Sequence, residues 1–191
     1  MARHYGLDLG DPNLRVVSEC CADHFFERPL AERRPAGPGD RLRLVGLGNL
    51  VEWKQWHVLL EAMGRLPAAE RARLEFHHWG TAPNTPDCQR YERRLQALVA
   101  RHQLEGTCVF HGLSLAVEET LRTAAWFVLP SLNEPCSVAL IEALALGLPA
   151  VVTASGGTWT LCGMRRRGCS SSRTMWRGWR GVSGGSPGAR R

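Results

Sequence analysis

The stretch that decides the fold is 130–157, which reads PSLNEPCSVALIEALALGLPAVVTASGG. It carries two glutamates eight positions apart, and its pattern predicts a loop around Glu134 and a helix that bears Glu142. The helix is expected to close at Gly147, where a left-handed residue costs little, and Pro149 prevents it from continuing. The apolar run PAVVT that follows predicts a buried strand.

Upstream of this stretch, strand and helix patterns alternate from residue 41 onwards. One helical pattern places Trp56, Leu59, Leu60, Met63 and Leu66 on a single apolar stripe. The predicted strands are RLRLVGLG (41–48), RLEFHHW (73–79), TCVFHG (107–112), WFVLP (126–130) and AVVT (150–153). The predicted helices are KQWHVLLEAMGRL (54–66), QRYERRLQALVARHQL (89–104), AVEETLRTA (116–124) and the helix that bears Glu142.

Five strands that alternate with crossover helices predict an α/β fold with a doubly wound, parallel, Rossmann-like sheet, because right-handed crossovers cover both faces. Ligands of such sheets bind at the carboxyl ends of the strands, near the point where the strand order reverses. The loops expected on that edge are 46–54, 80–86, 111–116 and 130–137. The predicted domain covers 41–157, and residues 1–40 are expected to be a linker or the remnant of an interdomain connection.

The basic charge of the chain belongs to its last segment. The 191 residues carry a formal net charge of +6, but residues 159–191 hold eight arginines and no acid, which leaves 16 basic and 18 acidic residues in 1–158. Nucleic-acid binding is therefore not expected of the folded part. The segment 158–191 is rich in arginine, glycine and serine, and predicts a disordered tail or a frame-shifted translation. An RNA-binding arm is its functional alternative.

Cysteine usage and hydropathy bear on the compartment. The seven cysteines are scattered and form no C-x-x-C pair, which suits a reducing cytosol better than a disulfide framework. No apolar run reaches the length of a membrane span, and the first 20 residues lack the apolar core of a signal peptide. We expect a soluble, cytoplasmic protein.

The spacing of the two glutamates suggests one chemistry. Eight residues of helix rise about 12 Å, which is comparable to the reach from ribose to sugar in an extended nucleoside diphosphate sugar. One carboxylate would accept sugar hydroxyls and the other the ribose hydroxyls. The amides of Cys136, Ser137 and Val138, at the helix start, would bind the diphosphate. The alternative is that Glu134 is a solvated loop acid and that Glu142 lies on an exposed helix face.

The stretch 130–157 closely resembles the signature of the retaining, nucleotide-sugar-dependent glycosyltransferases of GT-B architecture, the glycosyl transferases group 1 family. The elements of that signature are present here as Pro130-Ser131, Glu134-Pro135, Glu142-Ala143, Gly147-Leu148-Pro149 and Gly156-Gly157. The resemblance covers 41–157 and implies the C-terminal, donor-binding domain of a hexosyltransferase. By this resemblance Glu134 is the catalytic residue that contacts the transferred sugar, and Glu142 binds the ribose.

A second motif of the family reads Gly-Arg-Leu-x-x-x-Lys-Gly and begins here at Gly48. By resemblance, Lys54 is the phosphate-binding lysine, which suits a leaving diphosphate whose developing charge needs a fixed cation. The family's arginine is replaced by Asn49 and the glycine after the lysine by Gln55. Loss of one cation would weaken donor binding by about 1.5–3 kcal/mol. Ser137 stands where the family usually has glycine, which is a tolerable change.

Other interpretations of single motifs are weaker. Gly46-Leu47-Gly48 begins like a dinucleotide fingerprint, but Val51 takes the place of the third glycine and no ribose-binding acid ends the second strand. His77-His78 has no third metal ligand at a sensible spacing, so packing or a position near the nucleotide base is expected. Trp53 and Trp56 are expected to be helix-start and core residues.

The resemblance also implies partners and missing parts. It implies a nucleoside diphosphate sugar as donor substrate, no metal or other cofactor, and a glycan, lipid or small molecule as acceptor. The family's N-terminal domain needs more residues than the 40 that precede the predicted domain. We therefore expect a truncated donor-binding half that is inactive without a partner domain. The family continues after Gly157 with a further strand and helices, so the sheet is expected to be incomplete at its C-terminal end and marginally stable. The alternatives are a basic-tailed nucleic-acid-binding protein and a non-catalytic subunit that completes a partner chain.

Overall fold

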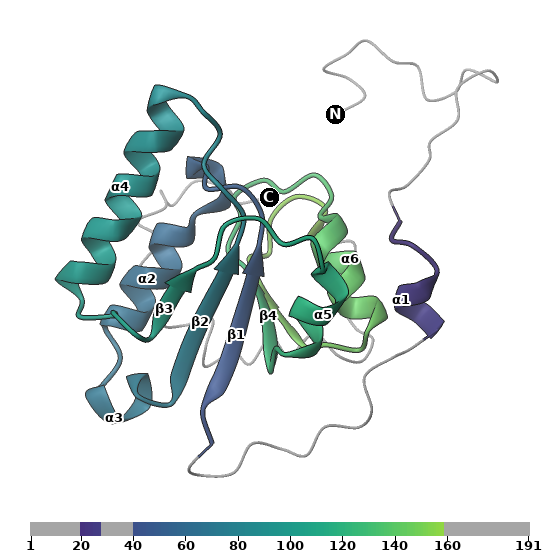
Figure 1. Cartoon of the computed structure of the whole chain (residues 1–191), viewed down its shortest axis with the longest axis horizontal. Coiled ribbons are helices and arrows are strands. Elements are labelled where there is room, and N and C mark those ends of the chain that lie inside the picture. The colour runs from purple at the N-terminus through teal and green to yellow at the C-terminus, as the bar shows by residue number, and fades with distance from the viewer. Residues whose placement is uncertain (1–19, 28–39, 159–191) are drawn as a thin grey trace, which may run out of the picture.

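A computed structural model describes residues 20–27 and 40–158 of the chain (Figure 1). Its centre is a five-stranded sheet in the order β3-β2-β1-β4-β5, in which every pair is parallel. The strands are β1 Leu42–Leu47, β2 Leu74–Trp79, β3 Cys108–Phe110, β4 Trp126–Leu129 and β5 Ala150–Val152. The predicted doubly wound parallel sheet is confirmed, with each strand inside its predicted segment.

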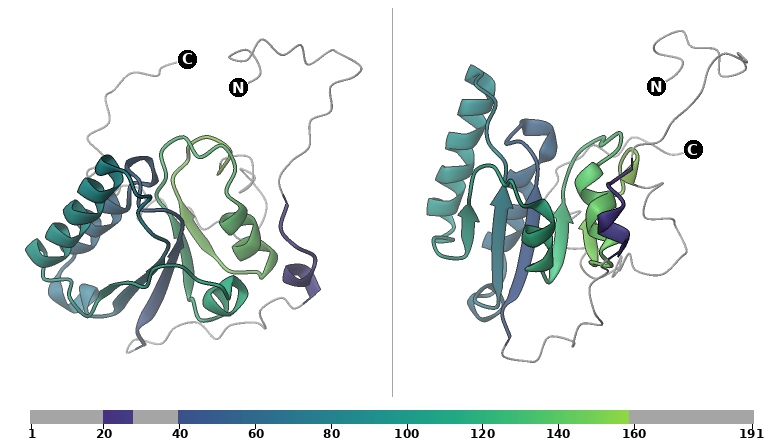
Figure 2. Two further views of the ribbon diagram at one scale, coloured as in Figure 1. Left: turned by 45° about the horizontal axis from the view of Figure 1, so that its top comes forward. Right: turned by 45° about the vertical axis from the view of Figure 1, so that its right-hand side comes forward.

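Helices cover both faces of the sheet (Figures 1 and 2). They are α1 His24–Glu27, the 3₁₀ turn η2 Glu52–Lys54, α2 Trp56–Gly64, α3 Ala68–Arg71, α4 Pro86–Arg101, α5 Val117–Arg122 and α6 Val138–Ala145. Helices α2 and α4 pack together on one face, whereas α5 and α6 lie on the other. This division is the one that right-handed crossovers require when the chain first moves from β1 to β3 and then returns to β4 and β5.

Helix α4 begins earlier than predicted. Its N-cap is Thr85, whose side chain accepts a hydrogen bond from the Cys88 amide at 3.3 Å, and Pro86 occupies the first helical turn. The sequence Thr-Pro-Asp, which was predicted to be loop, therefore starts the helix in the way that a capping threonine followed by proline favours. The short elements α3 and η2 were not predicted.

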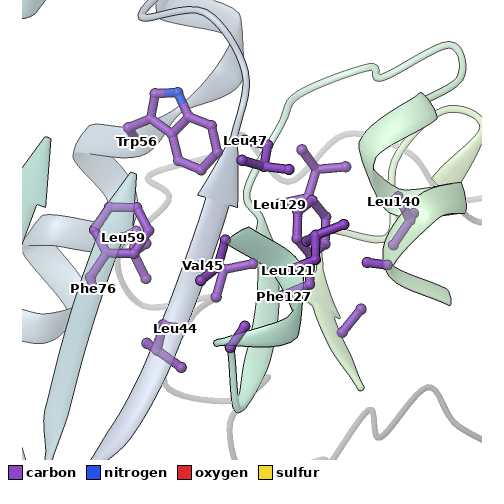
Figure 3. Packing of buried hydrophobic residues seen from close by; sticks show 14 of the residues in the cluster. Leu44, Val45, Leu47, Trp56, Leu59, Phe76, Leu121, Phe127, Leu129 and Leu140 are labelled. Carbon is purple, nitrogen blue, oxygen red and sulfur yellow. The ribbon is translucent and has the colours of Figure 1, made fainter. Parts of the chain in front are cut away.

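The core lies between the sheet and its helices, and Figure 3 shows part of it. The fully buried large side chains include Trp56, Phe76 and Phe127. On the predicted helical stripe, Trp56, Leu59, Leu60 and Met63 are buried and Leu66 is half-buried. Gly46 makes room for this packing, because a Cβ atom there would lie 2.8 Å from the Trp56 ring.

Two side chains of residues 20–27 pack into the folded core, although a linker was predicted for 1–40. Cys21 and Phe25 are buried in the main hydrophobic cluster at 7% and 4% exposure, and α1 contacts α6. The sequence pattern does not predict this packing, because the four residues of α1 are too few to show a helical period of apolar side chains. Residues 1–19 and 28–39 lie outside the described part.

The described residues include 158, where the tail was predicted to begin. Thr158 is fully buried, and its hydroxyl donates to the Thr153 carbonyl at 2.7 Å. The predicted arginine-rich tail from 159 onwards lies outside the described residues. Within 20–27 and 40–158, no helix is both long and apolar enough to cross a bilayer.

Candidate functional site

The strand order reverses between β1 and β4, which are neighbours in the sheet but far apart in the chain. The loops that leave their carboxyl ends therefore diverge and open a crevice, the usual ligand site of such sheets. The two loops are tied together, because the Leu132 amide donates to the Trp53 carbonyl at 2.8 Å.

A cavity of about 370 Å³ lies at this switch point. Its lining includes residues from all four loops expected on this edge and from the start of α6. Every residue predicted for the donor site lines it: Gly48, Asn49, Lys54, Glu134, Cys136, Ser137, Val138 and Glu142. The structure thus brings the whole predicted set together, while the binding role of each residue remains a prediction.

An ion pair joins the two sides of the cavity. Lys54 Nζ lies 2.6 Å from Glu134 Oε2, and the two side chains are only 12% and 3% exposed. Glu134 is therefore a buried, paired carboxylate, and the alternative of a solvated loop acid is wrong. Lys54 is also the single lysine in the 191 residues, all other basic side chains apart from histidine being arginine.

The indole of Trp53 lies beside this pair. Lys54 Nζ is 4.3 Å from the Trp53 ring centroid, a cation–π distance. Trp53, a predicted helix-start residue, is 44% exposed, whereas Trp56 is fully buried in the core as predicted. Trp53 follows the strand on the η2 turn, which turns its side chain to the surface.

Two glycines after β5 hold the backbone of Glu134. The Gly157 amide donates to the Glu134 carbonyl at 2.6 Å. A Cβ atom on Gly156 would overlap the Glu134 carbonyl, and one on Gly157 would overlap that of Pro135. The closing Gly-Gly of the motif therefore allows the backbone contact that fixes the catalytic candidate.

The amino end of α6 forms the next part of the wall. Ser137 is its N-cap, and its hydroxyl accepts a hydrogen bond from the Leu140 amide at 3.3 Å. The serine that replaces a family glycine thus caps the helix. The first amides of a helix have no partner within it and carry the positive end of its dipole, so they favour an anion in the cavity.

Glu142 lies on the second turn of α6, half-buried and lining the cavity. Burial raises the pKa of its carboxyl, an effect that the nearby His24 partly offsets. As predicted, Glu134 lies in a loop and Glu142 on a helix, so the rise of an eight-residue helix does not measure the distance between them. Both carboxylates line the same cavity, as predicted.

The two departures from the lysine motif have different consequences. Asn49 is exposed, and its carbonyl accepts a hydrogen bond from Trp56 Nε1 at 3.1 Å, so its backbone is fixed while its side chain adds no charge. Gln55 adopts a left-handed conformation with φ 54° and ψ 33°. The glycine of the family motif would occupy this conformation without strain.

The two adjacent histidines lie on opposite faces of β2. His78 is fully buried beside Trp56, at 4.6 Å between ring centroids, and burial lowers its pKa to about 3. His77 instead lies beside His111, with its Nδ1 2.8 Å from His111 Nε2. Within the described ranges, no group of three or more His, Cys, Asp or Glu side chains could hold a metal ion.

Sequence reasoning did not place seven further lining residues in the site: Leu47, Trp79, Gly80, Leu113, Ser114, Val117 and Ala139. Leu47 and Trp79 end β1 and β2, Gly80 follows β2, Leu113 and Ser114 lie in the loop after β3, Val117 starts α5, and Ala139 lies on α6. The signal was available for Trp79, because it is the last residue of its strand and directly precedes the Gly80 turn.

Taken together, the fold and the cavity define a doubly wound, Rossmann-like domain with a cation, two carboxylates and a helix start at its switch point. The chain belongs to the family of glycosyl transferases group 1, whose pattern it matches over residues 41–169. This match runs beyond residue 157, where the resemblance was expected to end.

Curated relatives agree with this family. The chain is 33% identical over 158 residues to a protein of Escherichia coli K12 provisionally named colanic acid biosynthesis glycosyltransferase WcaL, covering 78% of this chain and 36% of that one. The WcaL of Salmonella typhimurium is 33% identical over 133 residues, covering 65% and 31%. The chain thus spans about a third of the length of the curated relatives it matches.

Solved structures share the fold at lower identity. HepE of Anabaena, crystallised with UDP-glucose, superposes with a TM-score of 0.60 at 20% identity, over 74% of this chain and 38% of HepE. WaaG, a glycosyltransferase involved in lipopolysaccharide biosynthesis, superposes with a TM-score of 0.56 at 22% identity, over 64% and 31%.

Proposed function

We propose that this domain binds a nucleoside diphosphate sugar in the switch-point cavity and serves a glycosyltransferase that transfers the sugar with retention. The observation that carries the proposal is the meeting of all eight predicted residues on one cavity, across a buried Lys54–Glu134 pair. The crystal structures of HepE with UDP and with UDP-glucose, which share this fold, support the choice of ligand.

Lys54 and the start of α6 are suited to the diphosphate. An ammonium has three N–H donors, and one of them is directed at Glu134, so two are left for phosphate oxygens. The first amides of α6 add neutral donors and the helix dipole. As the bond to the sugar breaks, negative charge develops on the leaving diphosphate, and both groups stabilise it in place.

The two glutamates are suited to the two ends of the ligand. The pairing with Lys54 fixes the Glu134 carboxylate at the reacting end, where it accepts hydroxyls of the transferred sugar. Glu142, on the next turns of the same wall, accepts the two ribose hydroxyls. Each pair of hydroxyls offers two hydrogen-bond donors, and a carboxylate offers only acceptors. The assignment therefore gives every donor of the pair an acceptor.

The proposal includes transfer without a bound metal. The cavity offers one ammonium and a helix start for the charge that a divalent cation neutralises in other sites. Addition of EDTA should therefore leave the affinity for UDP unchanged. A large loss of affinity with EDTA, restored by Mg²⁺ or Mn²⁺, would contradict this part.

A second domain is proposed to supply the acceptor site. The curated relatives are long enough to contain such a domain, because this chain matches only about a third of their length. The acceptor is a glycan, lipid or small molecule. The 191-residue chain alone is then expected to bind donor without transferring it. Transfer by the chain alone would contradict this, and the coupling constant of the anomeric proton in the product would report whether configuration is retained.

The single lysine allows a direct test of the donor site. Selective labelling of the lysine ε-carbon with ¹³C gives one side-chain signal, that of Lys54. We expect this signal to shift on addition of UDP or a UDP-sugar, or of the guanosine or adenosine equivalents, and not on addition of uridine. Absence of any shift at millimolar concentrations of all these nucleotides would overturn the proposal.

Matched variants complete the test. Glu142→Gln should weaken binding of UDP and leave binding of inorganic pyrophosphate unchanged, because it alters only the proposed ribose contact. Glu119→Gln, an exposed acid on α5 that does not line the cavity, is the control and should leave both unchanged.

A further inference from the structure

Three flat side chains form a cluster at the carboxyl ends of β2 and β3. The rings of Trp79 and His111 lie 4.3 Å apart with an interplanar angle of 13°. The rings of His77 and His111 lie 5.1 Å apart at 11°, and those of His77 and Trp79 lie 5.9 Å apart at 23°. The Trp79 and His111 rings therefore stack face to face, whereas the His77 ring meets His111 edge to edge.

Hydrogen bonds fix the two imidazoles of this cluster. His77 Nδ1 lies 2.8 Å from His111 Nε2, and His77 Nε2 lies 3.2 Å from Glu75 Oε2. If the Nε2 proton of His77 donates to the Glu75 carboxylate, Nδ1 of a neutral His77 accepts from His111. This chain of hydrogen bonds orients both imidazole rings, including the face of His111 that the Trp79 indole contacts.

The order of the strands decides which face of the Trp79 indole is covered. Strand β2 lies between β3 and β1. His111 follows β3 and covers the indole from that side. The opposite side of the indole is turned towards β1, whose Leu47 is the register partner of Trp79 and, like Gly48, lines the same cavity. The cavity therefore has a flat aromatic wall that no described ring covers on its inner side.

We propose that Trp79 is the residue on which the nucleobase of the donor stacks, and that His111 and His77 are positioning residues for its ring. This inference rests on the function proposed above. The wall lies at the Trp79–Gly80 and Leu113–Ser114 end of the cavity, across from α6 with its proposed ribose carboxylate. A planar base is the part of a nucleotide that gains most from an indole, and the gain depends little on which base it is.

The main test compares nucleotides with and without a base. The affinities of UDP, ADP and inorganic pyrophosphate are measured by calorimetry for the unaltered chain and for Trp79→Leu. We expect the variant to bind UDP and ADP about tenfold more weakly and pyrophosphate with unchanged affinity. Trp126→Leu, at the amino end of β4 and away from the cavity, is the matched control and should change none of the three.

A second measurement covers the case in which Trp79→Leu folds poorly. With 5-fluorotryptophan in place of tryptophan, the ¹⁹F signal missing from Trp79→Phe identifies Trp79. This signal should shift on addition of UDP, through the ring current of the base, and stay in place on addition of pyrophosphate. His111→Leu should weaken UDP binding by a smaller factor than Trp79→Leu, because it only loosens the indole.

The outcomes separate the two proposals. If the unaltered chain binds no nucleotide, the proposed function falls, and this inference with it. If it binds UDP and Trp79→Leu binds UDP equally well, the stacking role alone is overturned. An equal loss of UDP and pyrophosphate affinity in Trp79→Leu would also overturn it, because that result indicates a collapsed cavity.

Discussion

Asn49 and Lys54 lie five positions apart on the lining of one cavity, and only Lys54 is charged. Lys54 is the one cationic side chain of the described lining, which also holds Glu134 and Glu142, so a second cation should add to the attraction for a diphosphate. Asn49→Arg should tighten UDP binding by about tenfold, as expected for one added charged hydrogen bond. The measurement is calorimetry at low ionic strength. Asn49→Gln is the control for size and should have no effect, and an Asn49→Arg variant that binds no better would show that this position does not reach the phosphates.

Gln55 adds backbone strain next to the same lysine. A left-handed conformation costs a residue with a Cβ atom about 1–2 kcal/mol, whereas glycine adopts it freely but loses part of that gain to the entropy of the unfolded chain. Gln55→Gly should therefore raise the free energy of unfolding by up to about 1 kcal/mol, measured by urea denaturation. Gln55→Ala keeps the Cβ atom and should not stabilise the protein. A destabilising Gln55→Gly would mean that the Gln55 side chain contributes more than its backbone costs.

At the scale of elements, the loop 130–137 is held by the segment after β5 rather than by its own sequence. The Asn133 amide donates to Ser155 Oγ at 2.7 Å, and the Thr153 hydroxyl donates to the Ser131 carbonyl. Gly157 adds its bond to the Glu134 carbonyl. Two segments far apart in the chain thus form one unit, which explains why the motif extends from Pro130 to Gly157 and not only around the two glutamates.

Helix α1 offers a test at the same scale, because two adjacent phenylalanines differ in burial. Phe25 is 4% exposed in the core, whereas Phe26 is 59% exposed. Phe25→Ala should lower the free energy of unfolding by about 3 kcal/mol, and Phe26→Ala should change it by less than about 0.5 kcal/mol. Urea denaturation of both variants checks this. Equal effects of the two would mean that residues 20–27 do not pack on α6 in solution.

For the whole molecule, the strands and the switch point were predictable because apolar periods and the order of elements determine them. The boundaries of α4 and the burial of Phe25 were not predicted, since the first depends on a cap and the second on contacts far away in the chain. The site residues were predicted from a motif. The contact between Lys54 and Glu134, however, joins positions 80 residues apart, which no local sequence pattern can predict. The stack on Trp79 likewise needs β2 and β3 side by side.

The stability of the whole molecule should depend on pH through His78, whose imidazole is fully buried. Its pKa in the folded protein is about 3, because burial disfavours the charged form, against an ordinary value of 6.5. Below pH 6.5 the unfolded chain binds a proton that the folded protein does not. Stability is therefore complete above this pH and is lost as the pH falls towards 3, by up to about 1.4 kcal/mol per pH unit.

Between about pH 7 and pH 5 this loss amounts to about 2 kcal/mol. Urea denaturation at the two pH values should show the loss in the unaltered protein and a loss smaller by about that amount in His78→Leu, whose side chain cannot titrate. The readout is the change in the free energy of unfolding between the two pH values, compared between variant and unaltered protein. The absolute stability is not suitable, because the substitution also alters packing against Trp56 and shifts stability at every pH. His24→Gln, with a side chain 54% exposed, is the control and should keep the slope. An unchanged slope in His78→Leu would show that the imidazole is protonated in the folded protein, and hence that its surroundings are more polar than the packing of β2 against α2 implies.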